Sequence, residues 1–415
     1  MASRKVEVVV AGHLCLDIIP DLSQVCVQPS QFFSPGKLVE IGPAALSTGG
    51  LVPNTGLALV RLGVSAALMG KVGDDPFGAL VRLLLERWGA GEDLLVVPGE
   101  ATSYTIALNP KGLDRMFLHD PAANTTFCAN DIRYDVVTKA RLFHLGYPPL
   151  LRRFYVDGGR ELVEVFRRVK ELGVTTSLDV SLPDPNSPSG QVDWRAVLSR
   201  VIPYTDIFLP SAEEILYMLD RPRYDDYKDT NPVDILPLVT GDDLNRLGDT
   251  LLNMDGKIVG VKCGARGFYL RTSSEAQLRE IGRAKPADVP AWANREVVEP
   301  AYRVANYAGA TGAGDSAIAG FLAAYLRGHS VERCLQYACA AGAFNVTALD
   351  ALSGLRPWDE TVAAVDAGWE KNPLKVTGEG WSQRQDGLWI GPKDAGSQDR
   401  GLDSQHLAID KANQQ

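Results

Sequence analysis

Apolar residues in the first ninety positions recur with two periods, one typical of strands and one typical of helices. Val6–Ala11 is rich in β-branched residues and ends at a glycine, as expected of a strand buried on both faces. Asn54–Leu62 carries apolar residues at helical spacing before another glycine. Ala66–Val72 then predicts a strand and Phe77–Trp88 a helix. This alternation favours an α/β domain with a mostly parallel sheet.

The same alternation returns after residue 140 and continues to about residue 350. The further predicted strands are Leu142–Leu145, Thr175–Asp179, Ile207–Leu209, Ile258–Lys262 and Phe268–Leu270. The further predicted helices are Gly158–Leu172, Trp194–Val201, Asp315–Arg327 and Val331–Thr347. Residues 220–241 are rich in Pro, Asp and Tyr, and this composition predicts an inserted surface loop.

The pattern changes to strict alternation between Ser103 and Phe127. Tyr104, Ile106 and Leu108 alternate there with small or polar residues, which is typical of strands with one exposed face. We expect a small antiparallel sheet, formed from parts of residues 13–48 and 100–130, that acts as a lid over the main domain.

The chain becomes polar and glycine-rich from about residue 370. Trp369, Trp381 and Trp389 are isolated there, and the last twenty-odd residues have little apolar surface to bury. We therefore expect a main domain over residues 1–369 and a partly irregular extension over 370–415, ordered to about Trp389.

Charge and composition narrow the range of partners. The net charge of −9 argues against a nucleic-acid partner, because duplex binders usually present a basic surface. No apolar run is long enough to span a bilayer, so we expect no membrane partner and a cytoplasmic location. The six cysteines form no CxxC pair, and the five histidines form no spaced Cys/His motif. A transition metal held by the protein is therefore not expected.

The segment Gly309–Asp315, with sequence GATGAGD, precedes a strongly helical run. Small residues let a ligand approach the backbone closely, and the first N–H groups of a helix have no partner within it. Together with the helix dipole they form an anion hole. Asp315 lies at the mouth of this hole, where a carboxylate either caps the helix or accepts a proton from an attacking hydroxyl.

The helix dipole favours the charged form of Asp315, so the sequence predicts a weak base. A weak base is compatible with phosphoryl transfer, because the nucleophile loses its proton late in a loose transition state. Positioning and charge neutralisation supply most of the rate acceleration in that case.

Four segments in the right order resemble motifs of the ribokinase-like (PfkB) carbohydrate kinase family. They are Thr48–Asn54, Gly70–Gly78, Lys262–Gly267 and Ala310–Phe321, and the resemblance covers roughly residues 6–360. It implies a ribokinase-like α/β fold, in which a central mostly parallel sheet is flanked by helices and a small β-sheet lid closes over the acceptor. It also implies a kinase that uses ATP and Mg²⁺.

The resemblance assigns roles to individual residues. Asp315 matches the catalytic base, and Gly312, Ala313 and Gly314 match the anion hole. The acceptor-binding positions are Asp17, Gly49, Gly50 and Asn54; the nucleotide-binding positions are Gly264, Gly267 and Cys339. Taken alone, Asp17 fits a solvated turn equally well, and Asn54 fits a helix cap.

The sequence departs from the family pattern at two ion-binding positions. Ser211 replaces the asparagine of an Asn-x-x-Glu motif, while Glu214 keeps the acidic position expected to support the metal. Gly309 stands where many members have an aspartate that helps to bind a monovalent cation. Potassium activation is therefore in doubt, although backbone carbonyls of residues 346–353 remain as candidate ligands.

Several acceptors and one non-enzymatic function remain open. The lid has few basic residues, chiefly Lys37, Lys111 and Arg115, which disfavours an acceptor that already carries phosphate. A nucleoside would need stacking partners, for which Phe32, Phe33 and Phe117 are candidates. The Ser211 substitution and the extension would also suit an inactive, kinase-like binding protein. A homodimer is compatible with the family resemblance.

Overall fold

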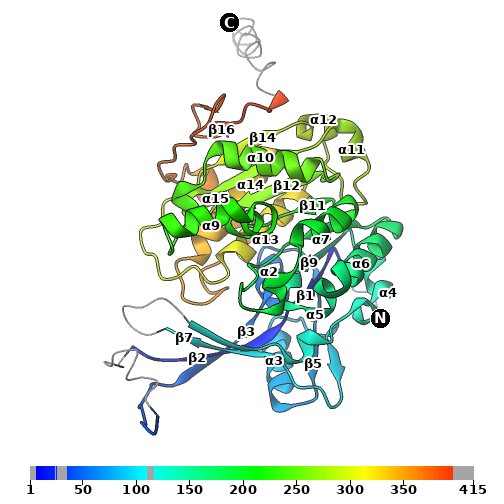
Figure 1. Ribbon diagram of the computed structural model, residues 1–415, viewed down its shortest axis with the longest axis vertical. Helices are drawn as coiled ribbons and strands as arrows, with labels where there is room; N and C mark the ends of the chain where they lie inside the picture. The colour runs from blue at the N-terminus through cyan, green and yellow to red at the C-terminus, as the bar shows by residue number, and fades with distance from the viewer. Residues whose placement is uncertain (1–5, 24, 26–34, 110–115, 396–415) are drawn as a thin grey trace, which may run out of the picture.

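The computed structural model describes residues 6–23, 25, 35–109 and 116–395. A ten-stranded sheet runs through its centre in the order β15-β16-β14-β13-β12-β11-β10-β9-β1-β4 (Figure 1). From β4 to β12 all neighbouring strands are parallel, and from β12 to β15 all are antiparallel. The strands are β1 (Val8–Gly12), β4 (Ala66–Met69), β9 (Leu142–Gly146), β10 (Thr175–Leu178), β11 (Ile207–Phe208), β12 (Ile258–Lys262), β13 (Phe268–Thr272), β14 (Glu296–Glu299), β15 (Ser382–Gln383) and β16 (Trp389–Ile390).

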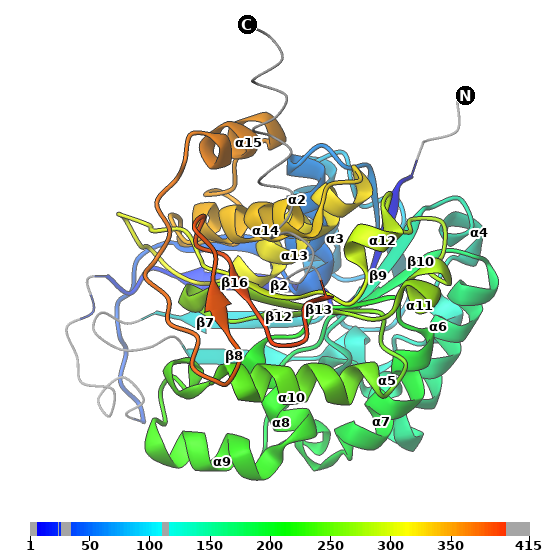
Figure 2. The same cartoon turned by 90° about the horizontal axis from the view of Figure 1, so that it is seen from above.

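Helices cover both faces of this sheet, and each face has its own hydrophobic core (Figure 2). One face carries α2 (Leu51–Arg61), α13 (Ala313–Leu326) and α14 (Val331–Asn345). The other carries α6 (Arg160–Glu171), α7 (Trp194–Val201), α8 (Ala212–Leu219) and α10 (Gly241–Leu252). The shorter helices include α4 (Tyr134–Val137), α5 (Arg152–Tyr155), α11 (Glu275–Arg279), α12 (Val289–Trp292) and α15 (Trp358–Asp366). The expected α/β class is confirmed.

α13 is apolar on all sides and is buried along nearly its whole length. It packs closely on α14 at Gly320, where a Cβ atom would lie only 2.4 Å from the carbonyl oxygen of Tyr337. A helix that is apolar all round must lie inside a protein. The helix that carries Asp315 is therefore held firmly from two sides, by α14 and by α2.

A second sheet of four strands projects from the main body as the predicted lid (Figure 1). Its order is β3 (Ala44–Gly49), β2 (Cys15–Pro20), β7 (Tyr104–Leu108) and β8 (Met116–Asp120). The prediction that this sheet is antiparallel is wrong at one pair, because β2 and β7 run parallel. The chain between them passes through α2 and α3 (Pro76–Glu86), a connection long enough for the crossover that a parallel pair requires.

Two other local predictions are corrected. The run Ala66–Val72 divides at Gly70 into β4 of the main sheet and β5 (Lys71–Gly73), which pairs with β6 (Leu95–Val97). The supposed loop over 220–241 contains the helix α9 (Arg221–Thr230). Its polar composition concealed two tyrosines three positions apart, Tyr224 and Tyr227, which are both buried on one face of the helix.

The extension after residue 370 contributes strands to the central sheet, because β16 pairs with β14. Arg295 forms a buried ion pair with Asp394 of the extension at 3.0 Å. The structure describes the extension as far as residue 395, and most of the loose tail expected after Trp389 lies outside the described residues. The division of the chain at residue 369 stays a prediction. In the described segments we find no helix both long and apolar enough to cross a bilayer.

Candidate active site

Charged and polar side chains follow several parallel strands at their carboxyl ends. Tyr147 follows β9, Asp179 follows β10 and Lys262 ends β12, while Glu214 lies in the first turn of the helix after β11. The carboxyl ends of parallel strands meet at one edge of an open α/β sheet, and ligands usually bind there. The sheet therefore brings together residues that are far apart in the sequence.

The amino end of α13 faces the same edge. Gly312 precedes it in a left-handed conformation with φ of 72°, which glycine adopts without strain. The first intrahelical bond runs from the N–H of Ser316 to the carbonyl of Gly312 at 2.8 Å, so the helix supplies no partner for the N–H groups of Gly314 and Asp315. Ala313 differs from the expected anion hole, because its N–H donates to the Ala310 carbonyl at 3.1 Å.

The Asp315 carboxylate is buried and accepts hydrogen bonds from three side chains. Tyr147 Oη lies 2.9 Å from Oδ1 and 3.0 Å from Oδ2. Asn54 Nδ2 donates to Oδ2 at 3.0 Å, and Thr55 Oγ1 donates to Oδ1 at 3.3 Å. Tyr147 reaches this position from a left-handed backbone conformation, with φ of 62°. A strained backbone at a residue that holds a buried carboxylate is typical of a functional site.

Burial raises the pKa of Asp315 above its usual range, although the Lys262 ammonium and the three donors act in the opposite direction. The prediction of a weakened base is therefore wrong. Loss of water around the buried carboxylate is the largest cause of the pKa shift, and it outweighs the lowering by Lys262 and by the three donors. Asp315 is a stronger proton acceptor than a solvated aspartate.

Lys262 lies among three buried or half-buried carboxylates. Its ammonium bonds to Asp179 Oδ1 at 2.7 Å, and the charges of Glu214 and Asp315 also raise the pKa of Lys262. Burial raises the pKa of Asp179, and the neighbouring Glu214 and Asp315 raise it further. Three carboxylates around a single lysine leave an excess of negative charge, which a bound cation would offset.

Glu214 belongs to a capping box with Ser211. Ser211 N donates to Glu214 Oε2 at 2.6 Å, and Glu214 N donates to Ser211 Oγ at 3.2 Å. Serine caps a helix as well as asparagine does, so the replacement of asparagine leaves the local geometry intact. Glu214 is not in a group of three carboxylate, Cys or His ligands within coordinating distance of one another in the described part of the chain.

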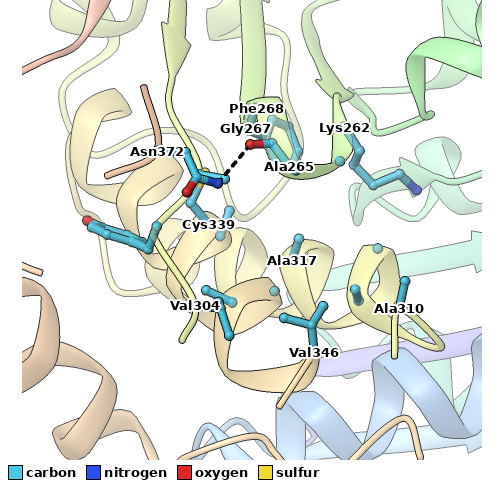
Figure 3. A pocket seen from close by; sticks show the side chains of 18 of the residues that line it. Lys262, Ala265, Gly267, Phe268, Val304, Ala310, Ala317, Cys339, Val346 and Asn372 are labelled. Carbon is cyan, nitrogen blue, oxygen red and sulfur yellow. Dashed lines mark hydrogen bonds between the residues drawn. The ribbon is translucent and has the colours of Figure 1, made fainter. Parts of the chain in front are cut away.

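An apolar cavity of about 370 Å³ opens beside the amino end of α13 (Figure 3). Gly264, Gly267 and Cys339, which the sequence assigned to nucleotide binding, all line this cavity, as do Ala313 and Gly314. Lys262 and Asn372 lie on opposite sides of it in this view. Its size and its small, apolar lining fit a nucleoside portion of a ligand.

Two details explain how the cavity keeps its shape. Gly267 has φ of 110°, and a Cβ atom there would lie 1.9 Å from the carbonyl oxygen of Glu299. Asn372 comes from the extension and donates from Nδ2 to the carbonyl of Ala265 at 3.1 Å. The extension therefore supplies part of the cavity wall, and no signal in the sequence pointed to Asn372.

Asp17, Gly49 and Gly50 lie together where the lid joins the main body. A Cβ atom on Gly49 would lie 2.3 Å from the carboxylate of Asp17, so this glycine makes room for the acid. Burial raises the pKa of Asp17 to about 6. Gly50 has φ of 92°, and a Cβ atom there would lie 2.6 Å from the carbonyl of His13. Asp17 is half-buried within strand β2, so it does not lie in a solvated turn.

Asn54 is buried within α2, so it does not cap that helix. Its Nδ2 is bonded to Asp315, while its Oδ1 has no hydrogen-bond partner among the described residues. A buried amide oxygen without a partner is costly, and a ligand hydroxyl would satisfy it. Of the lid residues weighed above, Phe32, Phe33, Lys111 and Arg115 lie outside the described residues.

The carbonyls proposed for a monovalent cation already take part in hydrogen bonds. Ala308 N donates to the Val346 carbonyl at 2.8 Å, and Asn345 Nδ2 donates to the Ala351 carbonyl at 2.6 Å. Each carbonyl keeps a second lone pair. Monovalent cation binding stays a prediction.

The sequence did not single out four residues of this site: Thr55, Tyr147, Asp179 and Lys262. Lys262 was part of a recognised segment but received no role, and Asp179 was placed at the end of a predicted strand. Tyr147 follows a predicted strand by two residues. Tyr147, Asp179 and Lys262 share one signal, a polar residue at or just after the end of a buried parallel strand, which becomes informative only when the strand order is known. Thr55 lies within α2 and carries no such signal.

The fold and this site define a class of protein, an α/β enzyme with an apolar cavity, a helix amino end and a buried carboxylate at one sheet edge. Residues 6–357 match the sequence family described as pfkB family carbohydrate kinase. The chain therefore belongs to the pfkB family of carbohydrate kinases, and the family predicted from the four motifs is confirmed.

Individual relatives agree with this assignment. The chain is 26% identical over 279 residues to an uncharacterized sugar kinase of Archaeoglobus fulgidus, covering 67% of this chain and 90% of that protein. It is 27% identical over 223 residues to Probable fructokinase-6, chloroplastic, of Arabidopsis thaliana, covering 53% of this chain and 54% of that protein. The structure of Arabidopsis thaliana ribokinase complexed with ribose and ATP matches with a TM-score of 0.62 and 19% identity, covering 86% and 97% of the two chains.

Proposed function

We propose that this carbohydrate kinase transfers the γ-phosphate of ATP to a hydroxyl of a sugar or sugar-like molecule, with Asp315 as the general base. One observation carries the proposal. The buried Asp315 carboxylate lies in the first turn of α13, and the first two residues of that helix, Ala313 and Gly314, line the nucleotide-sized cavity. Acceptor and phosphate donor would thus meet at a single helix end.

The residues divide the reaction between them. Asp315 takes the proton of the acceptor hydroxyl while the hydroxyl oxygen forms a bond to the γ-phosphorus of ATP. The bond from that phosphorus to the β,γ-bridging oxygen breaks, and ADP is released. Tyr147, Asn54 and Thr55 hold the carboxylate in place. The N–H groups of Gly314 and Asp315 stabilise the charge on the transferred group, with Gly312 permitting their approach.

The positive charge of Lys262 serves the same purpose. Its ammonium lies at the end of β12, at the border of the cavity, and is kept protonated by the surrounding carboxylates. A fixed cation near the phosphates neutralises charge that develops during transfer.

Mg²⁺ fits the surplus of carboxylates at this edge of the sheet. Asp179 Oδ2 is buried without a hydrogen-bond partner in the described part of the chain, and Glu214 lies on the neighbouring helix end. These two residues would hold the ion through water. When bound, Mg²⁺ neutralises charge on the phosphates of the nucleotide.

A sugar is favoured over a nucleoside as acceptor. The region beneath the lid offers the Asp17 carboxylate and Asn54 Oδ1, which has no hydrogen-bond partner within the described segments. Both groups can bind hydroxyls. Phe117, a candidate stacking partner for a base, lies on β8 with 59% of its surface exposed. The named plant relative is a fructokinase, which makes ketoses the first acceptors to test.

A panel assay tests this proposal directly. ADP release from MgATP is measured with ketoses, aldoses, sugar acids and nucleosides, and ³¹P NMR identifies the phosphorylated product. We expect turnover with at least one sugar and none with that sugar when ATP is omitted. Turnover with nucleosides alone would show that the acceptor is a nucleoside and not a sugar. ATP binding without turnover on any acceptor would instead indicate an inactive binding protein.

A further inference from the structure

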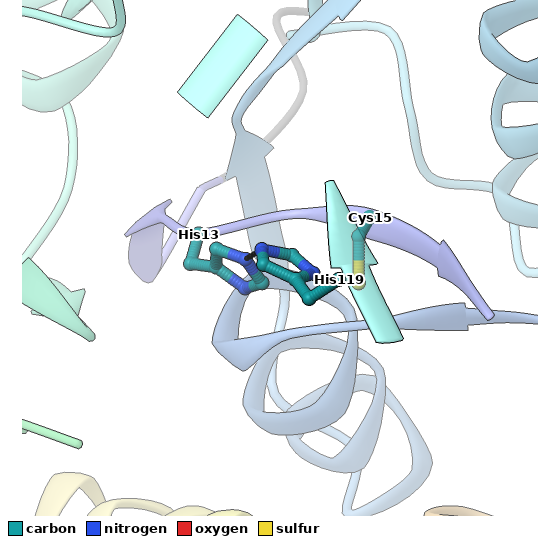
Figure 4. Close-up of side chains that lie close together, drawn as sticks. All are labelled: His13, Cys15 and His119. Carbon is teal, nitrogen blue, oxygen red and sulfur yellow. Dashed lines mark hydrogen bonds between the residues drawn. The ribbon is translucent and has the colours of Figure 1, made fainter. Parts of the chain in front are cut away.

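Three potential metal ligands converge at the junction of the lid and the main body (Figure 4). The imidazoles of His13 and His119 and the thiol of Cys15 each offer a ligand atom, and these atoms lie within 4.8 Å of one another. No other group of His, Cys, Asp or Glu side chains within the described ranges meets this distance. These three residues are a different set from the carboxylates around Lys262, although the ring of His13 lies beside that of Tyr147, with centroids 6.2 Å apart.

The three ligands come from separate parts of the fold. His13 follows β1, Cys15 begins β2, and His119 lies on β8, the outer strand of the lid. His119 is 106 residues from His13 in the sequence, so the ligand spacings of common zinc motifs are absent. The expectation that no Cys/His cluster exists was drawn from those spacings, and the folded lid corrects it.

The separation of the two imidazole nitrogens matches coordination to a tetrahedral ion. His13 Nε2 and His119 Nε2 are 3.4 Å apart. Two nitrogens that each lie about 2.0–2.1 Å from a tetrahedral Zn²⁺ are about 3.3–3.4 Å apart. The pair of rings is therefore already at the spacing that coordination would require.

The surroundings of the rings support a ligand role. His119 Nδ1 lies 2.9 Å from Thr105 Oγ1, and a donated Nδ1–H leaves the Nε2 lone pair facing His13. His13 is only 3% exposed, and its Nδ1 has no hydrogen-bond partner in the part of the chain that the structure describes. If Nδ1 carries the proton of His13, two lone pairs face each other across 3.4 Å, and a shared cation resolves this contact.

We propose that His13, Cys15 and His119 bind one divalent transition-metal ion of the Zn²⁺ class. Two neutral imidazoles and one thiolate are a ligand set that such ions prefer, and the fourth position is open to water. The Cys15 thiol gives up its proton to solvent when sulfur bonds to the metal, so binding is tighter at higher pH. Exposed His119 provides the route of entry.

The bound metal would join His119 on β8 of the lid to His13, which directly follows β1 of the central sheet. Its third ligand, Cys15, lies two residues from Asp17. Resting on the proposed kinase function, this position implies inhibition, because the ion fixes the lid and its open coordination site competes for acceptor hydroxyls. The metal site itself does not depend on that function.

Spectroscopy with Co²⁺ on the full chain tests the site. We expect one equivalent of Co²⁺ to give the intense bands of tetrahedral coordination together with a thiolate charge-transfer band. Cys15→Ser should lose the charge-transfer band, and His119→Gln should weaken binding by more than about tenfold, since even loss of an outer-shell partner costs that much. Cys128→Ser and His329→Gln, which alter a thiol and an imidazole elsewhere, should behave as wild type.

Equal Co²⁺ binding by wild type and Cys15→Ser, or no charge-transfer band in the wild type, would overturn the proposal. Alkylation of wild-type Cys15, followed by mass spectrometry with and without Zn²⁺, keeps the test valid if a variant fails to fold; protection by Zn²⁺ is expected, and unchanged labelling counts against the site. Zn²⁺ inhibition of turnover is measured separately. A chain that binds Co²⁺ through Cys15 but phosphorylates no acceptor would refute the kinase proposal and leave the metal site standing.

Discussion

The amino end of α13 and the lid sheet would serve the same reaction, but they are built in opposite ways. Phe321 of α13 is fully buried between two helices and the sheet, whereas Phe117 of β8 is 59% exposed. Every residue of β8 is exposed, and nearly every residue of α13 is buried. The amino end of α13 is thus fixed by core packing before any ligand arrives.

The lid has little packing of its own to hold it in one position. Exposed apolar residues such as Leu46, Phe117 and Leu118 gain burial only when something covers them. A surface of low packing density is suited to movement, and in the proposed reaction closure of the lid would exclude water from the transferred phosphoryl group. The comparison shows that the region around Asp315 is rigidly packed, whereas the lid, which would contact the acceptor, is free to adapt its shape.

The largest effect on turnover is expected from a substitution at the amino end of α13. Asp315→Asn removes the proton acceptor but keeps the size of the side chain, so turnover should fall by about 10²–10⁴-fold. The dissociation constant for ATP should change little, because Asp315 is not among the residues that line the cavity. Steady-state kinetics and calorimetry with ATP check the two halves of this prediction. Full activity in the variant would end the role assigned to Asp315.

The two phenylalanines measure the contrast in stability. Phe321→Ala should lower the free energy of unfolding by about 3–5 kcal/mol, because it leaves a cavity in the core. Phe117→Ala should change it by less than about 0.5 kcal/mol, as expected of an exposed position. Urea unfolding of both variants provides the comparison. Equal losses would show that the lid is packed as firmly as the core.

The pH dependence reports on the environment of Asp315. A base must be ionised to accept a proton, so kcat/KM falls as pH drops through the pKa of Asp315, which burial raises above its usual range. Tyr147 donates to this carboxylate and lowers its pKa. Tyr147→Phe should therefore move the acid limb of the kcat/KM profile to higher pH. Thr138→Val, at a position outside the site, is the control, and a shift to lower pH would contradict the assignment.

A smaller effect is expected at the wall that the extension supplies. Asn372→Ala removes one hydrogen bond to Ala265, worth about 0.5–1.5 kcal/mol, so the KM for ATP should rise a few-fold while kcat is nearly unchanged. Initial rates at varied ATP measure this split. Asn130→Ala is the control, because Asn130 is exposed and does not line the cavity; it should leave kcat and the KM for ATP unchanged. A large fall in kcat would place Asn372 in the reaction itself.

Most of the fold was accessible from the sequence, because buried parallel strands and their helices have strong apolar patterns. The parallel pairing of β2 and β7 was not, since an alternating strand fits either direction. Helix α9 was missed because nearly all of its charged residues face solvent and only its tyrosines are buried. Local composition reports the exposed face more strongly than the buried one.

The site was accessible in part for a related reason. Gly312, Gly314 and Asp315 are neighbours in sequence, so their arrangement follows from a single helix end. Tyr147 meets Asp315, and His119 meets His13 and Cys15, only across long separations in the sequence. No spacing of residues along the chain predicts either contact. The pKa of Asp315 was misjudged because burial depends on α2, which packs against it from another part of the chain.

A crystal structure with a non-hydrolysable ATP analogue, Mg²⁺ and the acceptor found in the panel assay tests the central claim most directly. The account predicts the γ-phosphate at the N–H groups of Gly314 and Asp315, with an acceptor hydroxyl within hydrogen-bonding distance of the Asp315 carboxylate. Phosphates bound elsewhere, or an acceptor held away from Asp315 in a closed complex, would contradict it.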